Sequence, residues 1–100
     1  MEIHWRNMDE IEASQRDAVE RRLHALADGH TDLIDLRIVA KPNNHHRLGG
    51  QEVHIACQAR GVELVAMRTG EDLGQALHEA VDAFVQEVRR LRDRRTDHRI

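Results

Sequence analysis

The chain has 100 residues, with 15 Lys or Arg against 18 Asp or Glu and a formal net charge of -3. A chain of this length builds one hydrophobic core, so we expect a single domain over residues 1–100. Its apolar runs are far shorter than the roughly 18 residues of a membrane span, and the start MEIHWRN lacks the pattern of a secretory signal. The lone Cys57 gives no disulfide framework. We therefore expect a cytoplasmic protein without a membrane partner.

Three elements are predicted before the first proline. Residues 2–6 alternate polar and apolar side chains, as a half-buried strand does. Residues 11–27 change to helical spacing and predict an amphipathic helix. Residues 33–41 alternate again and predict a second strand, which Pro42 should end. The inward face of this strand is expected to carry Ile34, Leu36, Ile38 and Ala40.

A loop and a hairpin follow. Residues 41–50, KPNNHHRLGG, are rich in turn residues and show no period, so we expect a flexible connection. Residues 52–60 and 62–67 alternate on either side of Gly61, which permits a tight turn, and together they predict a β-hairpin. The inward positions of the first of these strands are Val53, Ile55, Cys57 and Ala59.

The last predicted element is a long helix within residues 69–95. Its apolar residues recur at spacings of four, four, three, four and three, at Leu73, Leu77, Val81, Phe84, Val88 and Leu91. Glu71 and Asp72 at its start, and arginines at its end, suit the helix dipole. Because the apolar stripe ends at Leu91, we expect the final turns to project past the body of the domain. They would present Arg92, Arg94 and Arg95 to solvent.

These elements give the order βαβββα and an α+β fold class. Each predicted helix has one apolar face and each strand alternates. The economical packing is therefore a four-stranded sheet with both helices on one face, an arrangement like that of double-stranded-RNA-binding domains.

Charge is distributed unevenly along the chain. Residues 1–85 hold nine Lys or Arg against fifteen Asp or Glu, whereas the last fifteen residues hold six arginines. Guanidinium groups bind phosphate bidentately and keep their charge, so the tail arginines, joined by those of the first helix, predict contact with a polyanion. An alternative remains open, in which the arginines only form salt bridges on solvated helix faces. The acidic partners would then be Glu20, Glu87 and Asp93.

Other kinds of site have little support. The eight histidines raise the question of a metal, but His54 and Cys57 would point to opposite faces of their strand, and His45 and His46 lack a zinc spacing. We therefore expect no metal ion. No glycine-rich phosphate loop, activated nucleophile or paired carboxylate predicts an enzyme, a cofactor or a small-molecule substrate. With two aromatic residues in the chain, base stacking is also disfavoured.

Two stretches carry a family resemblance. QRDAVERRLHAL has the helix pattern of one family at Arg16, Val19, Arg21, Arg22, Leu23 and Leu26. The second stretch, GVELVAMRTGEDLGQALHEAVDAFVQEVRRLRDR, follows the pattern of the same family's hairpin and second helix. The matching positions are Gly61, Leu64, Ala66, Gly70, Asp72, Ala76, Ala80, Val81 and Asp82. Where the family usually has basic residues, this chain has Arg89, Arg90, Arg92 and Arg94. In both stretches the sequence resembles the ribosome hibernation promoting factor family, also known as ribosome-associated inhibitor A or protein Y.

The resemblance implies a short-form stress-response factor without a C-terminal dimerisation domain. Such a factor binds the 30S ribosomal subunit in the channel used by messenger and transfer RNA, and holds the ribosome idle. The implied contacts with 16S ribosomal RNA are Arg16, Arg21, Arg22, Arg89, Arg90, Arg92 and Arg94. The alternative is a diverged member that acts as a regulatory protein-interaction module, as in the family's older description as a sigma-factor modulator. The oligomeric state stays open.

Overall fold

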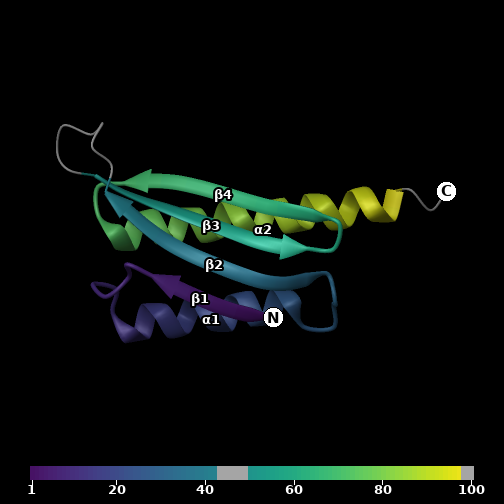
Figure 1. Ribbon diagram of the computed structural model, residues 1–100, viewed down its shortest axis with the longest axis horizontal. Coiled ribbons are helices and arrows are strands. Elements are labelled where there is room, and N and C mark those ends of the chain that lie inside the picture. Colours follow the sequence, from purple (N-terminus) through teal and green to yellow (C-terminus); the bar gives the residue numbers. More distant parts are fainter. Residues whose placement is uncertain (43–49, 98–100) are drawn as a thin grey trace.

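The computed structural model describes residues 1–42 and 50–97. The elements are β1 (Glu2–Arg6), α1 (Ala13–Ala27), β2 (Leu33–Pro42), β3 (Gln51–Ala59), β4 (Val62–Gly70) and α2 (Leu73–Asp97). This is the predicted βαβββα order (Figure 1). The predicted loop at 41–50, with His45 and His46, lies mostly outside the described residues.

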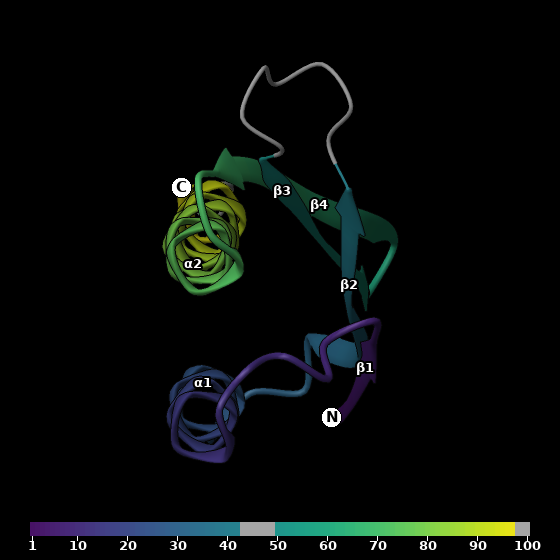
Figure 2. The ribbon, with the colours of Figure 1, turned by 90° about the vertical axis from the view of Figure 1, so that its left-hand side faces the viewer.

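The four strands form one mixed sheet in the order β1-β2-β3-β4. β1 pairs parallel with β2, and the other neighbours are antiparallel. Figure 2 shows α1 and α2 on the same side of the sheet, which confirms the predicted packing and leaves the opposite face open. We refer to that second side as the open face.

The core lies between the sheet and the two helices. Phe84 of α2, Leu23 of α1 and Ile55 of β3 are fully buried, and removal of each such side chain from water contributes about 1.5–3 kcal/mol. The predicted stripe of α2 is buried from Leu73 to Val88 and half-buried at Leu91. In the described part of the chain, neither helix combines the length and apolar composition that crossing a membrane requires.

One prediction for β2 is wrong, and another is off by one residue. Ile34 is 52% exposed, because the pairing with β3 shifts between Leu33 and Asp35. Such an irregularity changes which side chains face inward, and here it places Leu33 in the core instead. Pro42 is itself paired, opposite Gln51, so β2 ends at Pro42, one residue past its predicted end. A proline is tolerated there because the terminal residue of a strand can lack a ladder donor.

The helix and turn boundaries follow local capping chemistry. α2 begins at Leu73, directly after the predicted start at Glu71 and Asp72, and the backbone N–H of Gln75 donates to the Asp72 carboxylate at 2.8 Å. This contact satisfies one of the donors that a helix start leaves unpaired. Gly61 has φ 77°, which confirms the tight turn between β3 and β4. β4 itself extends three residues past its predicted end, to Gly70.

Candidate nucleic-acid interface

A groove between α1 and α2 carries basic side chains from both helices. Its volume is about 380 Å³, and its walls are formed by Arg22, Ala25, Leu26, His30, Val85, Arg89 and Arg92. A second hollow of about 250 Å³ also uses Arg22 and includes His78. Of the seven predicted arginines, Arg22, Arg89 and Arg92 line this groove, so the two arginine groups meet there in part, whereas Arg16, Arg21, Arg90 and Arg94 are not among its lining residues.

Three of the predicted arginines face solvent without a carboxylate partner among residues 1–42 and 50–97. Arg21 on α1 and Arg89 and Arg94 on α2 are exposed, and no ion pair involves them. Arg89 also lines the groove. These side chains can meet a phosphate without first giving up a contact within the domain.

Two further arginines are exposed but paired. Arg22 on α1 reaches across to Asp82 on α2 at 2.6 Å, and Arg90 contacts Glu87 at 3.0 Å. The second pair confirms the predicted partner Glu87. Exposed pairs of this kind stabilise by only about 0–1 kcal/mol, so a phosphate can replace the carboxylate at small cost. The other expected partners differ: Glu20 binds Trp5, and Asp93 has no ion pair within the described residues.

Arg92 does not project into solvent, and that prediction is wrong. Its side chain is 20% exposed, and its Nε and Nη2 donate to the two Asp32 carboxylate oxygens at 2.8 and 3.0 Å. The hydrogen bond from Arg92 lowers the pKa of Asp32 below its ordinary value, against the opposing effect of burial. Arg95 Nη2 also donates to the Arg60 carbonyl at 2.5 Å. The end of α2 is therefore tied to the start of β2 and to the β3–β4 turn.

Arg16 is likewise held inside the domain. Its Nη2 donates to the Met8 carbonyl at 3.1 Å, and its guanidinium lies 5.2 Å from the centroid of the Trp5 ring. The Trp5 ring nitrogen in turn donates to Glu20 at 2.7 Å. Arg16 thus joins the β1–α1 connection to α1. Trp5 is committed to this contact and Phe84 is fully buried, so neither aromatic ring offers a stacking platform.

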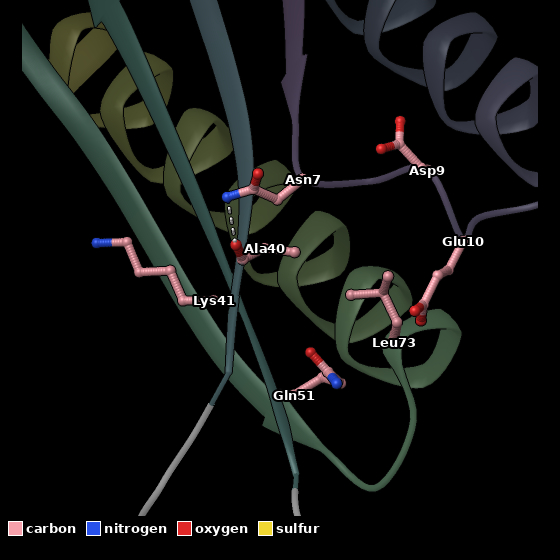
Figure 3. Close-up of a pocket in the computed structure, with 7 residues that line it drawn as sticks. All are labelled: Asn7, Asp9, Glu10, Ala40, Lys41, Gln51 and Leu73. Atoms are coloured by element: carbon pink, nitrogen blue, oxygen red, sulfur yellow. Dashed lines mark hydrogen bonds between the residues drawn. The ribbon is translucent and has the colours of Figure 1, made fainter.

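A separate hollow at the opposite end of the domain has different chemistry. It lies beside the starts of α1 and α2, and Figure 3 shows Asp9 and Glu10 on one side of it, with Asn7 donating to the Ala40 carbonyl at 3.4 Å. The Lys41 ammonium is directed away from the two carboxylates. Negative side chains repel phosphate, so this hollow does not extend the basic groove.

Several residues in and beside the two hollows left no direct sign in the sequence. His30 follows the turn at Gly29 and lines the groove beside Arg92, and His78 lies four residues before Asp82 on α2, with its Nε2 at 3.4 Å from that carboxylate. Asp32 and Asp82 decide which arginines are engaged. Each of these aspartates lies 60 residues along the chain from the arginine that it binds, so no local sequence pattern indicates the pair.

The mixed sheet, the two helices on one of its sides and the groove between them define the class: a small α+β domain with an arginine-lined groove between its helices. A ribosomal subunit interface protein from Coxiella burnetii has a similar structure, with a TM-score of 0.72 and 15% identity, over 93% of this chain and 99% of that one. The N-terminal domain of Thermus thermophilus Protein Y is also similar, with a TM-score of 0.65 and 21% identity, over 91% of this chain and 97% of that one. Both likenesses concern the fold.

The family follows from the sequence itself. The family model described as sigma 54 modulation protein / S30EA ribosomal protein matches residues 1–96. The chain belongs to this family, which confirms the resemblance drawn from the two helix patterns. No curated protein matches the sequence.

Proposed function

We propose that the protein is a ribosome-associated translation inhibitor of the hibernation type, active in the cytoplasm. It would bind 16S ribosomal RNA in the decoding channel of the 30S subunit and exclude messenger and transfer RNA by occupying their place. The observation that carries this proposal is the arginine-lined groove between α1 and α2 in a chain of the S30EA ribosomal protein family. That family is not known as a family of enzymes, and the proposed action needs no catalytic step or cofactor.

The seven predicted contact residues divide into three roles. Arg21, Arg89 and Arg94 are exposed without a carboxylate partner in the described structure and would bind phosphates directly. Arg22 and Arg90 would exchange a surface carboxylate for a phosphate. Arg16 and Arg92 would act by positioning, because their guanidinium groups hold the helices to the rest of the domain.

Binding of this kind is driven by counterion release. Each neutralised phosphate frees condensed cations, so affinity falls steeply as salt is raised. This mechanism also accounts for a body with a net charge of -3, since screening limits repulsion from carboxylates that lie more than about 8–10 Å from the contact. The affinity for RNA then depends more on the charges around the groove than on the net charge of the whole chain.

The test is co-sedimentation with purified 30S subunits at low and moderate salt. The variant Arg21→Glu/Arg89→Glu/Arg94→Glu should lose most of its binding, by at least tenfold. The matched control, Arg6→Glu/Arg37→Glu/Arg68→Glu, makes the same change in net charge on strands instead of helices and should bind nearly as the unaltered protein does. Equal losses in both variants would show that only total charge matters, and unaltered binding in the helix variant would refute the assignment.

A second candidate function rests on the open face of the sheet. Val65 is 56% exposed and Met67 is 46% exposed on β4, and apolar side chains of this kind favour contact with a protein. In that case the domain would act as a regulatory protein-interaction module. Val65→Glu/Met67→Glu separates the two functions, because it should leave 30S co-sedimentation unchanged while removing any activity that depends on a protein partner.

A further inference from the structure

Three side chains with metal-binding atoms meet on the open face, at the β1–β2 edge. Glu2 and His4 are two residues apart on β1 and therefore point to the same side. Asp35 of β2 lies directly opposite Glu2 in the parallel pairing. The backbone register thus brings these side chains together, on the side of the sheet away from the basic groove.

The spacing of the ligand atoms suits a small divalent cation. His4 Nε2 lies 2.9 Å from Asp35 Oδ1 and 3.4 Å from Glu2 Oε2, and one ligand atom from each of the three residues lies within 4.8 Å of the others. With bonds of about 2.0–2.2 Å, neighbouring ligands are separated by about 3.0 Å in an octahedral site and about 3.4 Å in a tetrahedral one. The two nitrogen–oxygen distances fall at these values.

One of these ligand atoms also lacks a hydrogen-bond donor. Asp35 Oδ1 is shielded from solvent and accepts no hydrogen bond from any described residue, although the His4 nitrogen is only 2.9 Å away. The two atoms are close without the alignment of a hydrogen bond. The Asp35 side chain is 42% exposed and lies within ion-pair distance of His4, and a divalent cation between the two groups would be held by both.

Two guanidinium groups lie close to the cluster, since Arg6 and Arg37 line the same hollow as His4 and Asp35. Arg37 is directly opposite His4 in the β1–β2 pairing, but its guanidinium reaches toward Glu63 on β4 at 3.4 Å. Arg6 is exposed farther along β1 and forms no ion pair with the cluster in the described structure. The cluster therefore keeps two carboxylates for one imidazole, which matches the charge of a divalent ion.

We propose that Glu2, His4 and Asp35 form a binding site for a divalent transition-metal ion of the zinc type. One imidazole nitrogen and two carboxylate oxygens favour Zn²⁺, Ni²⁺ or Cu²⁺ over Mg²⁺, which prefers oxygen ligands and keeps its water. Water would complete the coordination. The bound ion would link the edge strand β1 to β2 without touching the helix face.

The test uses the untagged protein, because a histidine tag binds the same metals. Calorimetric titration with ZnCl₂ should give one site, and the midpoint of thermal unfolding should rise by several degrees at saturating metal, whereas MgCl₂ should produce neither effect. His4→Gln and Asp35→Asn should each weaken Zn²⁺ binding by at least tenfold. Both residues are partly exposed, so circular dichroism should show folded variants.

His54→Gln is the matched control, since His54 on β3 also contacts a carboxylate, Glu52, on the open face. It should retain one Zn²⁺ site and the full thermal shift. Zn²⁺ binding that persists unchanged in both His4→Gln and Asp35→Asn would place the metal elsewhere and overturn the proposal. The absence of any saturable Zn²⁺ site in the unaltered protein would overturn it as well.

Discussion

Replacement of Arg92 with methionine would remove both hydrogen bonds that the Asp32 carboxylate accepts from it, while keeping a long apolar side chain at the position. The two side chains are 20% and 11% exposed, so the pair is largely shielded from water. Loss of one partner leaves a partly buried charge unpaired. The loss of unfolding free energy is then larger than when one partner of an exposed ion pair on the helices is removed.

The magnitude follows from the geometry. Two charge-assisted hydrogen bonds of 2.8 and 3.0 Å are lost, and a fully buried pair costs about 3–5 kcal/mol when one partner is removed. Because some exposure remains, we expect the free energy of unfolding to fall by about 2–4 kcal/mol. In a domain of this size that corresponds to a fall of roughly 8–30 °C in the melting temperature.

The assay is urea unfolding of the unaltered protein, Arg92→Met, Asp32→Asn and the double variant, all at pH 7. The double-mutant cycle isolates the pair from other contacts of Arg92 and should give a coupling energy of about 1.5–3 kcal/mol. A coupling energy below about 0.5 kcal/mol would refute the reasoning. It would mean that the bidentate contact contributes no more than an exposed pair.

The same pair predicts a pH dependence. The pKa of Asp32 is lowered by folding, so the unfolded chain binds the proton more tightly. The resulting stability is fully present above the unfolded pKa of about 4 and is lost as pH falls through the lower folded pKa. The difference in unfolding free energy between the unaltered protein and Asp32→Asn should therefore be constant from pH 5 to 7 and shrink below about pH 4.

Three further outcomes are expected. In Gly70→Ala the new Cβ would lie 2.9 Å from the Ala76 backbone nitrogen and cost about 1–3 kcal/mol in urea unfolding. In Gly74→Ala the new Cβ meets side-chain atoms alone, Gln15 at 3.2 Å and Asp72 at 3.4 Å, so this variant should be neutral or gain up to about 1 kcal/mol. Equal losses in the two variants would contradict the backbone contact at Gly70. Burial raises the pKa of the Cys57 thiol to about 11, so a disulfide reagent at pH 8 should label it only as fast as the protein opens, and rapid labelling of the native form would contradict its burial. With the five proposed phosphate contacts, the logarithm of the 30S binding constant should fall with the logarithm of the salt concentration with a slope of about -3.5 to -4.5. The triple helix-arginine variant should lose about 2 to 3 of that slope, and an unchanged slope would argue against phosphate contact.

Much of the fold could be predicted because hydrophobic periodicity is local. A period of two located every strand, and the helical period located both helices, with β1 matching its observed bounds. The irregularity near Ile34 could not be predicted, since it is a property of the pairing with β3 and leaves no trace in the alternation of β2 alone. The start of α2 was nearly predicted, because Glu71 and Asp72 suit a helix start and the helix begins at Leu73, after β4 ends at Gly70.

The candidate site was predicted less completely, because exposure of an arginine depends on distant partners. Two signals were nevertheless present. Arg16 lies three residues before Val19 and seven before Leu23. Arg92 lies four residues after Val88 and seven after Val85. Both arginines therefore continue the buried stripe of their helix, where a charged side chain must find a partner inside the domain.

The placement of both helices on one sheet has a mechanical consequence. Arginines of α1 and α2 face each other across a groove, and the strands beneath set its width through their spacing of about 4.8 Å. A substitution among the inward side chains of the sheet, such as Ile38 or Ile55, would alter that width while every charge stayed in place. Selection for a fixed distance between two anionic sites on a target would thus act on apolar positions that never meet the target.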